Sequence, residues 1–427
     1  MLQRRILDRL LAGAIAAAAL FSLSAFPPTA MAQPQGKPIT IGFGMALTGG
    51  LAPNGKAALL AMQLWEQEVN SKGGLLGRPV KLVFYDDQSN PSTVPGIYTK
   101  LLDVDKVDLV TSGYATNMVA PAMPVVMQHN RTFFALLGLA VNSEFNYPNY
   151  FSIGPTGGPK PKESFSRGFF EVAMAQNPKP QTVAIVGADA EFPRNALDGA
   201  RSIIKEKGLK IVYDKTYPPG TADYTPIVRA IQSVSPDLVF VASYPPDSVG
   251  IIRAASEVGL KTKLFGGGMV GLQSTAIKMQ LGPLLNGIVD YDFWLPTPAF
   301  ATPQALDMLK RYQAKAADAG VDQLGFYLPP FAYSLMQVLQ QSVEATQSLD
   351  DEKLAAYMRK TIFTTVAGPI QFNEHGEWVE ARVLEVQFQN VAGNGIEQFR
   401  DLSAEKILWP PAYKTGDVIY PYSDGKK

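Results

Sequence analysis

Two short apolar runs, Ile39-Thr-Ile-Gly-Phe43 and Val80-Lys-Leu-Val-Phe-Tyr85, flank a long amphipathic segment at residues 56–70. Short runs rich in Ile, Val and Phe are typical of strands. The segment between them carries Leu60 and Leu64 on one stripe, which predicts a helix with a single apolar face. A strand, a helix and a second strand in this order predict two parallel strands joined by a crossover helix.

The same alternation continues along the chain and restarts after residues 150–162, a stretch rich in Gly and Pro. Further strands are predicted at residues 109–111, 132–137, 182–186, 210–217, 238–242 and 263–265, and further helices at residues 94–103, 118–129, 195–207, 224–233 and 247–258. This alternation indicates an α/β fold with two lobes, each built on a doubly wound parallel sheet. A chain of 427 residues is long enough for two such domains.

The last third of the sequence breaks the alternation. Three helices are predicted at residues 303–320, 328–345 and 352–361, followed by a hairpin-like return over residues 370–388. Three helices alone cannot form another doubly wound domain, because such a domain needs a central sheet. We therefore expect them to pack on one of the sheets formed earlier in the chain.

The first 32 residues have the layout of a secretory signal peptide. Basic residues such as Arg4 precede an almost wholly apolar stretch at residues 10–26, and Ala30-Met31-Ala32 supplies small residues at a cleavage site. A membrane anchor is the alternative, but the compact apolar centre is short against the ~20 residues that span a bilayer. We predict cleavage after Ala32 and export to the periplasm.

Composition excludes several classes of function. The chain has no Cys, so it has no disulfide, no thiolate nucleophile, no Cys-bound metal and no lipid anchor on an N-terminal Cys. Its formal net charge is zero, which gives no basic face for nucleic acid. With 46% hydrophobic and 18% charged residues, the composition is that of a folded globular protein.

Motifs for cofactor or metal chemistry are weak or missing. Gly42 and Gly44 follow a strand, but the third glycine of a dinucleotide fingerprint would fall at Leu47. His129 and His375, the only histidines, lack the neighbouring ligands of a zinc site. We predict no cofactor, no metal and no enzymatic activity.

Five segments together resemble the type I periplasmic binding proteins of the leucine/isoleucine/valine-binding family, over residues 37–390. The segments are Ile41-Gly-Phe-Gly-Met-Ala-Leu-Thr-Gly-Gly-Leu-Ala-Pro-Asn-Gly55, Val69-Asn-Ser-Lys-Gly-Gly-Leu-Leu-Gly77, Tyr85-Asp-Asp-Gln88, Asp237-Leu-Val-Phe-Val-Ala-Ser-Tyr244 and Gly368-Pro-Ile-Gln-Phe-Asn-Glu-His-Gly376. The resemblance implies two lobes joined by a three-segment hinge, with a ligand held between them. It also implies a monomeric binding component that delivers a small molecule to an inner-membrane ABC permease. A sensory module for a receptor is an alternative use of the same fold.

The resemblance also implies where the chain passes between lobes. Lobe one is expected at residues 37–154 plus 292–365 and lobe two at residues 155–291 plus 366–390, with crossings near residues 151–156, 291–296 and 367–370. Residues 391–427 have no counterpart in the family, so their placement stays open.

Ligand contacts are carried over from the family by position. They fall in loops after predicted strands and on the first turns of helices, at Asn54, Thr116, Asn117, Leu139, Ala140, Val141, Phe192, Tyr244, Met269 and Phe331. By resemblance, Thr116 and Asn117 would hold a carboxylate and Tyr244 would cover the ligand. Val141 replaces a usual Thr, which removes one hydrogen-bond donor. The alternative to a binding role is that Phe192, Met269 and Phe331 are core residues.

One departure from the family bears on the ligand. Its amino-acid binders place an Asp or Glu in the loop after the strand at residues 264–265, whereas this chain has Gly266-Gly-Gly-Met-Val270. An ammonium group buried without a counter-charge is strongly disfavoured. We therefore expect an aromatic or aliphatic carboxylate without an α-ammonium group. Asp290 or Asp292 could supply the missing charge, which keeps a branched-chain amino acid as the alternative.

Overall fold

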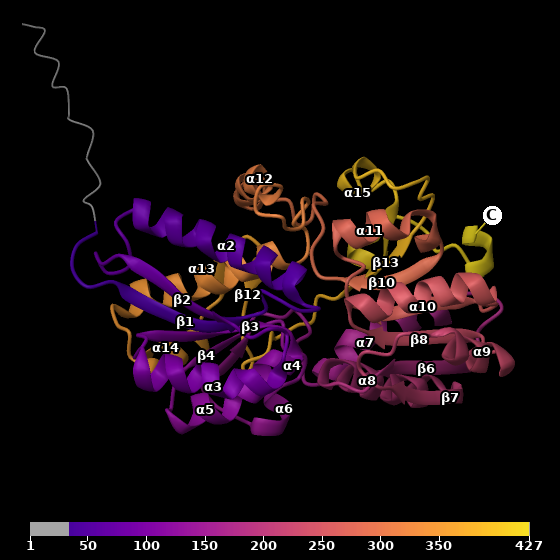
Figure 1. Cartoon of the computed structure of the whole chain (residues 1–427), viewed down its shortest axis with the longest axis horizontal. Coiled ribbons are helices and arrows are strands. Elements are labelled where there is room, and N and C mark those ends of the chain that lie inside the picture. The colour runs from indigo at the N-terminus through magenta and orange to yellow at the C-terminus, as the bar shows by residue number, and fades with distance from the viewer. Residues whose placement is uncertain (1–33, 427) are drawn as a thin grey trace, which may run out of the picture.

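The computed structural model describes residues 34–426 as two α/β lobes that lie side by side (Figure 1). The predicted signal peptide and its cleavage after Ala32 lie outside the described residues. Within the described range, no helix combines the length and the apolar character that crossing a bilayer requires.

The first lobe is built on a parallel five-stranded sheet of order β2-β1-β3-β4-β5. Its strands are β1 (Ile39–Met45), β2 (Val80–Asp86), β3 (Leu109–Tyr114), β4 (Phe133–Leu136) and β5 (Tyr150–Ser152). Its early helices are α2 (Ala52–Ser71), α3 (Val94–Thr99), α4 (Thr116–Val119), α5 (Met123–Gln128) and α6 (Asn142–Phe145). All carboxyl ends of the parallel strands point to one edge of the sheet, which faces the second lobe.

The predicted late helices complete this first lobe. They are α12 (Pro303–Ala316), α13 (Leu328–Thr346) and α14 (Asp351–Met358). Helix α13 packs along α2 on one face of the sheet, while α3 and α5 cover the other face (Figure 1). The expectation that these helices pack on an earlier sheet is confirmed.

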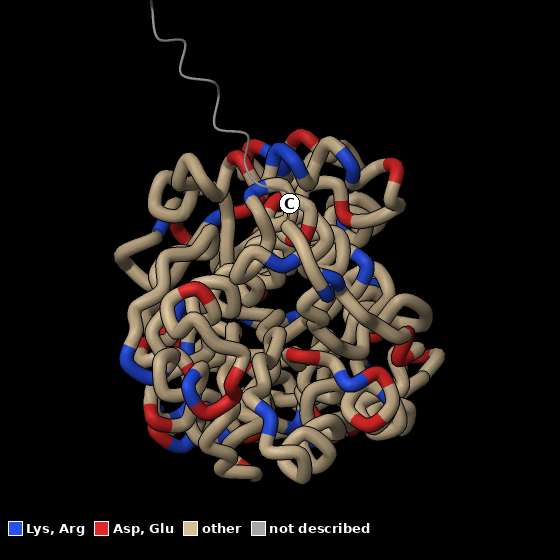
Figure 2. Tube along the Cα trace, turned by 90° about the vertical axis from the view of Figure 1, so that its left-hand side faces the viewer, with Lys and Arg blue, Asp and Glu red and all other residues tan. Residues whose placement is uncertain are grey.

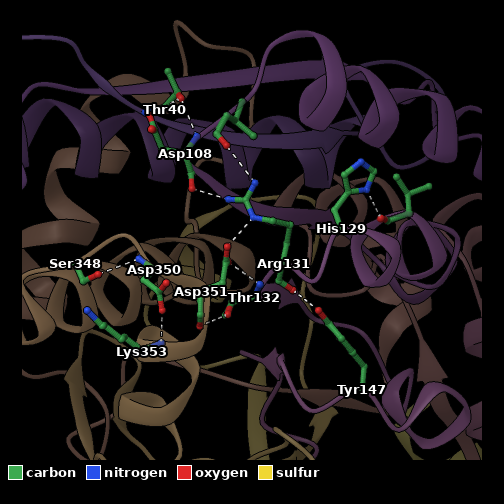
Figure 3. A network of polar contacts seen from close by, with 12 residues as sticks. Thr40, Asp108, His129, Arg131, Thr132, Tyr147, Ser348, Asp350, Asp351 and Lys353 are labelled. Carbon is green, nitrogen blue, oxygen red and sulfur yellow. Dashed lines mark hydrogen bonds and ion pairs between the residues drawn. The ribbon is translucent and has the colours of Figure 1, made fainter.

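A polar network fixes the start of α14 to the residues that precede β3 and β4 (Figure 3). Arg131 Nε donates to Asp351 Oδ2 at 2.8 Å, and the backbone amide of Thr132 donates to Asp351 Oδ1 at 2.7 Å. Arg131 also donates to the carbonyl oxygen of Asp108, whose carboxylate accepts from the Thr40 amide at 2.8 Å. The network therefore ties residues from widely separated parts of the chain into one lobe.

The second lobe contains a mixed seven-stranded sheet of order β14-β13-β10-β9-β8-β6-β7. Its strands are β6 (Thr182–Ala188), β7 (Lys210–Tyr217), β8 (Leu238–Ser243), β9 (Leu264–Met269), β10 (Ile288–Asp292), β13 (Leu384–Phe388) and β14 (Glu405–Trp409). Its main helices are α7 (Pro161–Met174), α8 (Glu191–Lys207), α9 (Thr225–Ser233), α10 (Pro245–Val258) and α11 (Thr275–Leu281). The five strands from β6 to β10 are parallel, and β13 and β14 add to their edge in antiparallel fashion.

The C-terminal segment, which the sequence left unplaced, packs on this second lobe. Strand β14 pairs with β13, and the ring of Tyr422 lies 5.3 Å from that of Phe265. Lys278 on α11 forms a buried ion pair with Glu405 at the start of β14, with Nζ and Oε2 2.5 Å apart. The last strand is therefore part of the core of the lobe.

Three chain segments cross between the lobes, as the fold class predicted. The first joins β5 to α7, and the second joins β10 to α12. The third leaves the small β11–β12 hairpin (Phe363–Thr365 with Gly368–Ile370) and leads to β13. Gly376 still bonds to β5, because its carbonyl oxygen accepts from the Ser152 amide at 2.8 Å. The chain thus contacts the first lobe beyond residues 367–370, where the resemblance places the crossing.

Candidate functional site

A cavity of about 400 Å³ lies between the lobes, at the carboxyl ends of strands from both sheets. It is lined by Tyr114, Ala115, Thr116, Leu137, Gly138, Leu139, Gly154, Thr156, Phe165, Phe192, Tyr244, Val270, Tyr291, Phe293 and Tyr327. Parallel α/β sheets leave a crevice at this edge because the connecting loops diverge there. The largely apolar lining suits a small organic molecule.

Seven aromatic rings form an arc around this cavity, each in contact with the next. In order along the arc they are Tyr244, Phe192, Phe165, Tyr291, Phe293, Tyr327 and Tyr114, with neighbouring ring centroids 4.8–6.3 Å apart. Such distances and the mostly tilted or edge-on geometry are favourable for aromatic pairs. The arc starts in the second lobe and ends in the first, so both lobes contribute to one aromatic wall.

Three tyrosine hydroxyls of the arc form a hydrogen-bonded chain. The oxygens of Tyr291 and Tyr327 are 2.9 Å apart, and those of Tyr114 and Tyr327 are 3.5 Å apart. Burial raises the pKa of Tyr114 to about 12, although hydrogen bonds from Tyr327 and Asn54 partly offset it. Because the three hydroxyls remain protonated, two of their hydrogens serve the two internal bonds and one is left for a ligand.

Two threonines add further donors to the lining. Thr156, which is 4% exposed and lies on the first crossing segment, has a hydroxyl oxygen without a hydrogen-bond partner in the described chain. Thr116 accepts a hydrogen bond from the Leu139 amide at 3.0 Å, so its own hydroxyl hydrogen points elsewhere. A buried polar group without a partner is costly and is usually explained by a ligand or water. The cavity therefore offers neutral donors.

The loops that hold these donors adopt strained backbone conformations. Ala115 has φ 88° and ψ 145°, and Leu137 has φ 56°. Residues with a side chain rarely adopt positive φ, and such strain concentrates at functional sites. The strain supports a binding role for this edge of the first sheet.

None of the residues that line the cavity carries a charge. The prediction that Gly266–Gly268 form a loop is wrong. These residues lie inside β9, between two neighbouring strands. A Cβ at Gly266 would lie 1.6 Å from the Val289 carbonyl oxygen, so these glycines serve close packing. The loop that follows β9 begins at Val270, and it also lacks a carboxylate between Val270 and Ser274.

The two aspartates considered as replacements are both occupied elsewhere. Asp290 accepts from the Met269 amide and from the Gln273 side chain, each at 2.9 Å. Asp292 accepts from the Phe293 amide at 2.7 Å. Burial raises the pKa of Asp290 well above its ordinary value and that of Asp292 to about 8. Neither residue lines the cavity, so neither stands where it could pair with a ligand ammonium group.

The ten residues selected from the sequence fall into three groups. The structure brings Thr116, Leu139, Phe192 and Tyr244 into the lining. Asn54 and Asn117 line adjoining grooves, while Ala140, Val141, Met269 and Phe331 are buried behind the lining. The lining instead contains Val270, which follows Met269 at the end of β9, and Tyr327, which lies one helical turn before Phe331.

Sequence reasoning missed most of the aromatic arc. Tyr291 and Phe293 lie at the second crossing, and Phe165 lies on α7, where the family offered no position to carry over. A signal was present in the run Asp290-Tyr-Asp-Phe-Trp294, which places bulky aromatics directly after a strand. Thr156, in the first crossing, carried no comparable signal.

The two lobes are in direct contact around the cavity. Tyr244 of the second lobe donates its hydroxyl hydrogen to Asn117 Oδ1 of the first lobe at 2.7 Å. Asn195 Nδ2 on α8 donates to the Leu139 carbonyl oxygen at 3.0 Å. The two lobes are therefore closed onto each other beside the cavity.

Residues 38–389 match the sequence model of the family described as periplasmic binding protein. The chain belongs to this family. Among its relatives is a leucine-, isoleucine-, valine-, threonine- and alanine-binding protein of Pseudomonas aeruginosa, 23% identical over 79% of this chain and 87% of that protein. The Leu/Ile/Val-binding protein of Escherichia coli is 23% identical over 78% of this chain and 86% of its own length. The named relatives are binding proteins, not enzymes.

Solved structures share the fold of this periplasmic binding protein. A branched-chain amino acid transporter substrate-binding protein of Streptococcus pneumoniae, in complex with isoleucine, superposes with a TM-score of 0.69 at 18% identity, covering 90% of this chain and 100% of that one. A solute-binding protein of R. palustris in complex with benzoate gives 0.71 at 16% identity, covering 83% and 94%. Another R. palustris protein, in complex with 4-hydroxybenzoate, gives 0.70 at 19%, covering 84% and 94%. The fold thus accompanies both kinds of ligand.

Proposed function

We propose that this periplasmic binding protein is the solute-binding component of an ABC transporter and that it captures a small carboxylic acid, preferably an aromatic one. The observation that carries the proposal is the uncharged cavity, which combines an aromatic arc with hydroxyl donors that lack acceptors. Aromatic walls favour a flat apolar ring. Hydroxyl donors favour an oxyanion, because a carboxylate only accepts hydrogen bonds.

The orientation of the ligand follows from the same residues. Thr116 and Thr156 donate to the carboxylate, and the arc from Phe165 to Phe293 surrounds the ring. The remaining hydroxyl hydrogen of the Tyr114–Tyr327–Tyr291 chain serves a second oxygen acceptor. Closure of the lobes buries the ligand, and the closed form is what an inner-membrane permease receives. The protein acts as a monomer in this scheme.

A branched-chain amino acid is the second candidate, because the relatives from Pseudomonas aeruginosa and Escherichia coli are named for such ligands. It requires an acceptor for the ammonium group. Within the described residues, the cavity lining supplies only carbonyl and hydroxyl oxygens for that purpose. The absence of a carboxylate from the lining places this candidate second.

Isothermal titration calorimetry of the purified mature protein tests the proposal. Benzoate, 4-hydroxybenzoate and hexanoate are titrated beside leucine, isoleucine and valine, with methyl benzoate and benzylamine as uncharged and cationic controls. We expect binding of the acids and none of the controls or amino acids. A bound acid at 100 times its Kd also adds about 2.7 kcal/mol of stability, which appears as a raised melting temperature. Tight leucine binding without binding of any acid would overturn the proposal.

A further inference from the structure

The side chain of Tyr244 separates the cavity from a second, larger space. Tyr244 lines the cavity and also a groove of about 1210 Å³ that opens to solvent between the lobes. The groove takes its other walls from both lobes, including Gly50 and Asn117 of the first and Glu191 of the second. Tyr244, which is partly exposed, is the one residue that the two linings share.

Tyr244 is held in place from the opposite lobe. Its hydroxyl donates to Asn117 Oδ1 at 2.7 Å, and its ring lies 5.9 Å from that of Phe192. Asn117 follows Thr116 at the start of α4, so one short helix of the first lobe supplies both a lining residue and the partner of this tyrosine. Both were expected to bind the ligand, yet the Tyr244 hydroxyl hydrogen and Asn117 Oδ1 are used on each other.

The backbone around Tyr244 is also fixed. Tyr244 precedes α10, whose first residues Pro245 and Pro246 restrict the backbone at this turn. Asp247 in the same turn accepts from the Tyr224 hydroxyl at 2.8 Å, which anchors the start of the helix. A methyl group at Gly50 would lie 3.8 Å from Pro246, so the first lobe lies close to this turn.

The wall on the other side of the cavity differs. Tyr327 separates the cavity from a smaller groove of about 270 Å³. Its ring stacks on Phe293 at 5.8 Å, it is only 6% exposed, and its hydroxyl is bonded within the tyrosine chain. The side of Tyr244 is therefore the one on which a ligand can extend or leave.

We propose that Tyr244 and Asn117 form a gate that closes the cavity towards the large groove and so sets the maximum length of the ligand. A ligand that stays behind the gate is limited in length, and a longer one has to displace the ring of Tyr244. The gate itself follows from the contacts of these two residues, and only the chemical class of the ligand rests on the proposed function.

Thiol labelling tests the gate without any ligand. Because the chain has no Cys, Val270→Cys introduces a single thiol into the lining. N-ethylmaleimide should label it slowly, and adding Tyr244→Ala should raise the rate by roughly tenfold or more, the effect of a change in opening equilibrium near 1.4 kcal/mol. Tyr244→Phe and Asn117→Ala, which each remove one net hydrogen bond, should raise the rate roughly fivefold.

The matched control is Tyr224→Phe, which removes a buried tyrosine hydroxyl bond at the start of the same helix but outside the cavity lining. We expect it to leave the labelling rate unchanged. Each variant is compared below its melting temperature, so that global unfolding does not contribute. Equal labelling rates with and without Tyr244→Ala would overturn the gate.

Ligand length is the second readout. Calorimetry should show that the unaltered protein prefers benzoate to biphenyl-4-carboxylate by at least ~tenfold and that Tyr244→Ala reverses most of this preference. An unchanged preference in Tyr244→Ala would contradict the length limit. If leucine binds instead of benzoate, the proposed function fails, and phenylalanine and 4-phenylphenylalanine then replace the two acids. The labelling result stands in either case, so the two failures are distinguishable.

Discussion

The cavity between the lobes and a buried charge cluster both include residues at the end of strand β10, but the cavity lining is uncharged whereas the cluster consists of ionisable side chains. Tyr291 and Phe293 face the cavity, which contains no charged residue. Asp292, between them, belongs to a buried cluster with Lys278 and Glu405. The chain thus uses buried ions to hold its own segments together and offers the ligand only neutral donors. Acidic and basic residues are interspersed along the rest of the chain (Figure 2).

The cluster is an ion pair with an additional carboxyl group. The side chains of Lys278 and Glu405 are 3% and 1% exposed. Burial opposes the charge on Lys278, but Glu405 and Asp292 outweigh it and raise the pKa of the lysine. Burial raises the pKa of Asp292 to about 8, with a further contribution from Glu405. The stability of the cluster therefore depends on Lys278, the one basic residue of the three.

Lys278→Met should have the largest effect, because it leaves the Glu405 carboxylate buried without a partner. We expect a loss of about 3–5 kcal/mol in the free energy of unfolding. Urea denaturation monitored by circular dichroism measures it. The double variant Lys278→Met with Glu405→Leu should recover much of the loss, since an apolar pair of similar size replaces the ions. A loss below about 1 kcal/mol in the single variant would contradict this role.

Val270→Asp should break the neutrality of the cavity. A carboxylate in the lining repels a bound carboxylate in surroundings that screen poorly, so we expect benzoate affinity to fall by about 100-fold or more, equivalent to ~2.7 kcal/mol. Calorimetry at pH 7 measures it, with Val270→Asn as the uncharged control of nearly the same shape. Equal affinities of the two variants for benzoate would count against an oxyanion in this cavity.

Glu377 offers a third case, a buried carboxyl without a cation. It is 2% exposed, both oxygens lack partners among the described residues, and burial raises its pKa from 4.5 to about 8. Between these values the folded protein keeps a proton that the unfolded chain has lost. Stability should therefore fall as pH rises from 5 to 8, by up to about 1.4 kcal/mol per pH unit.

Glu377→Gln removes this titration, so its melting temperature should decline less over the same pH range. The two curves should lie closest near pH 5, where Glu377 is protonated in the folded protein. Melting curves at intervals of half a pH unit provide the comparison. Parallel curves for the two proteins would show that Glu377 does not titrate between folded and unfolded states.

Thr156→Val should have the smallest effect and only on binding. The variant removes a donor that has no protein partner, so we expect a five- to tenfold loss of benzoate affinity, about 1 kcal/mol, with stability unchanged. Thr156→Ser keeps the hydroxyl and should retain most of the affinity. A loss of melting temperature in Thr156→Val without a loss of affinity would assign the hydroxyl to folding instead.

Much of the fold could be predicted because it depends on periodic patterns. The strand at Ile39 and the helix after it need only the local alternation of apolar residues. Where strands β9 and β10 meet, the local pattern failed: Gly266–Gly268 look like a turn but continue a strand. Glycine is needed at Gly266 because the carbonyl oxygen of Val289, on the neighbouring strand, leaves no room for a side chain. The two residues are more than twenty positions apart, so the local pattern could not indicate this contact.

The site was harder to predict, since its residues come from loops and crossings. Tyr244 follows a clear strand and reached the lining as expected. Phe331 lies one helical turn beyond Tyr327, and it is Tyr327, just before α13 begins at Leu328, that lines the cavity. Thr156 lies in a crossing segment and Tyr291 lies at the end of β10, beside one. The path of these segments is set by the packing of whole lobes.

The repeated crossing of the chain bears on how the protein is made. The first lobe needs α13 and α14, at residues 328–358, and the second needs β13 and β14, at residues 384–409. Neither hydrophobic core is complete while the ribosome is still adding the last quarter of the chain. Early segments therefore expose the faces that later helices and strands will cover. A polypeptide assembled in this order cannot complete either core until segments from its last quarter have been made.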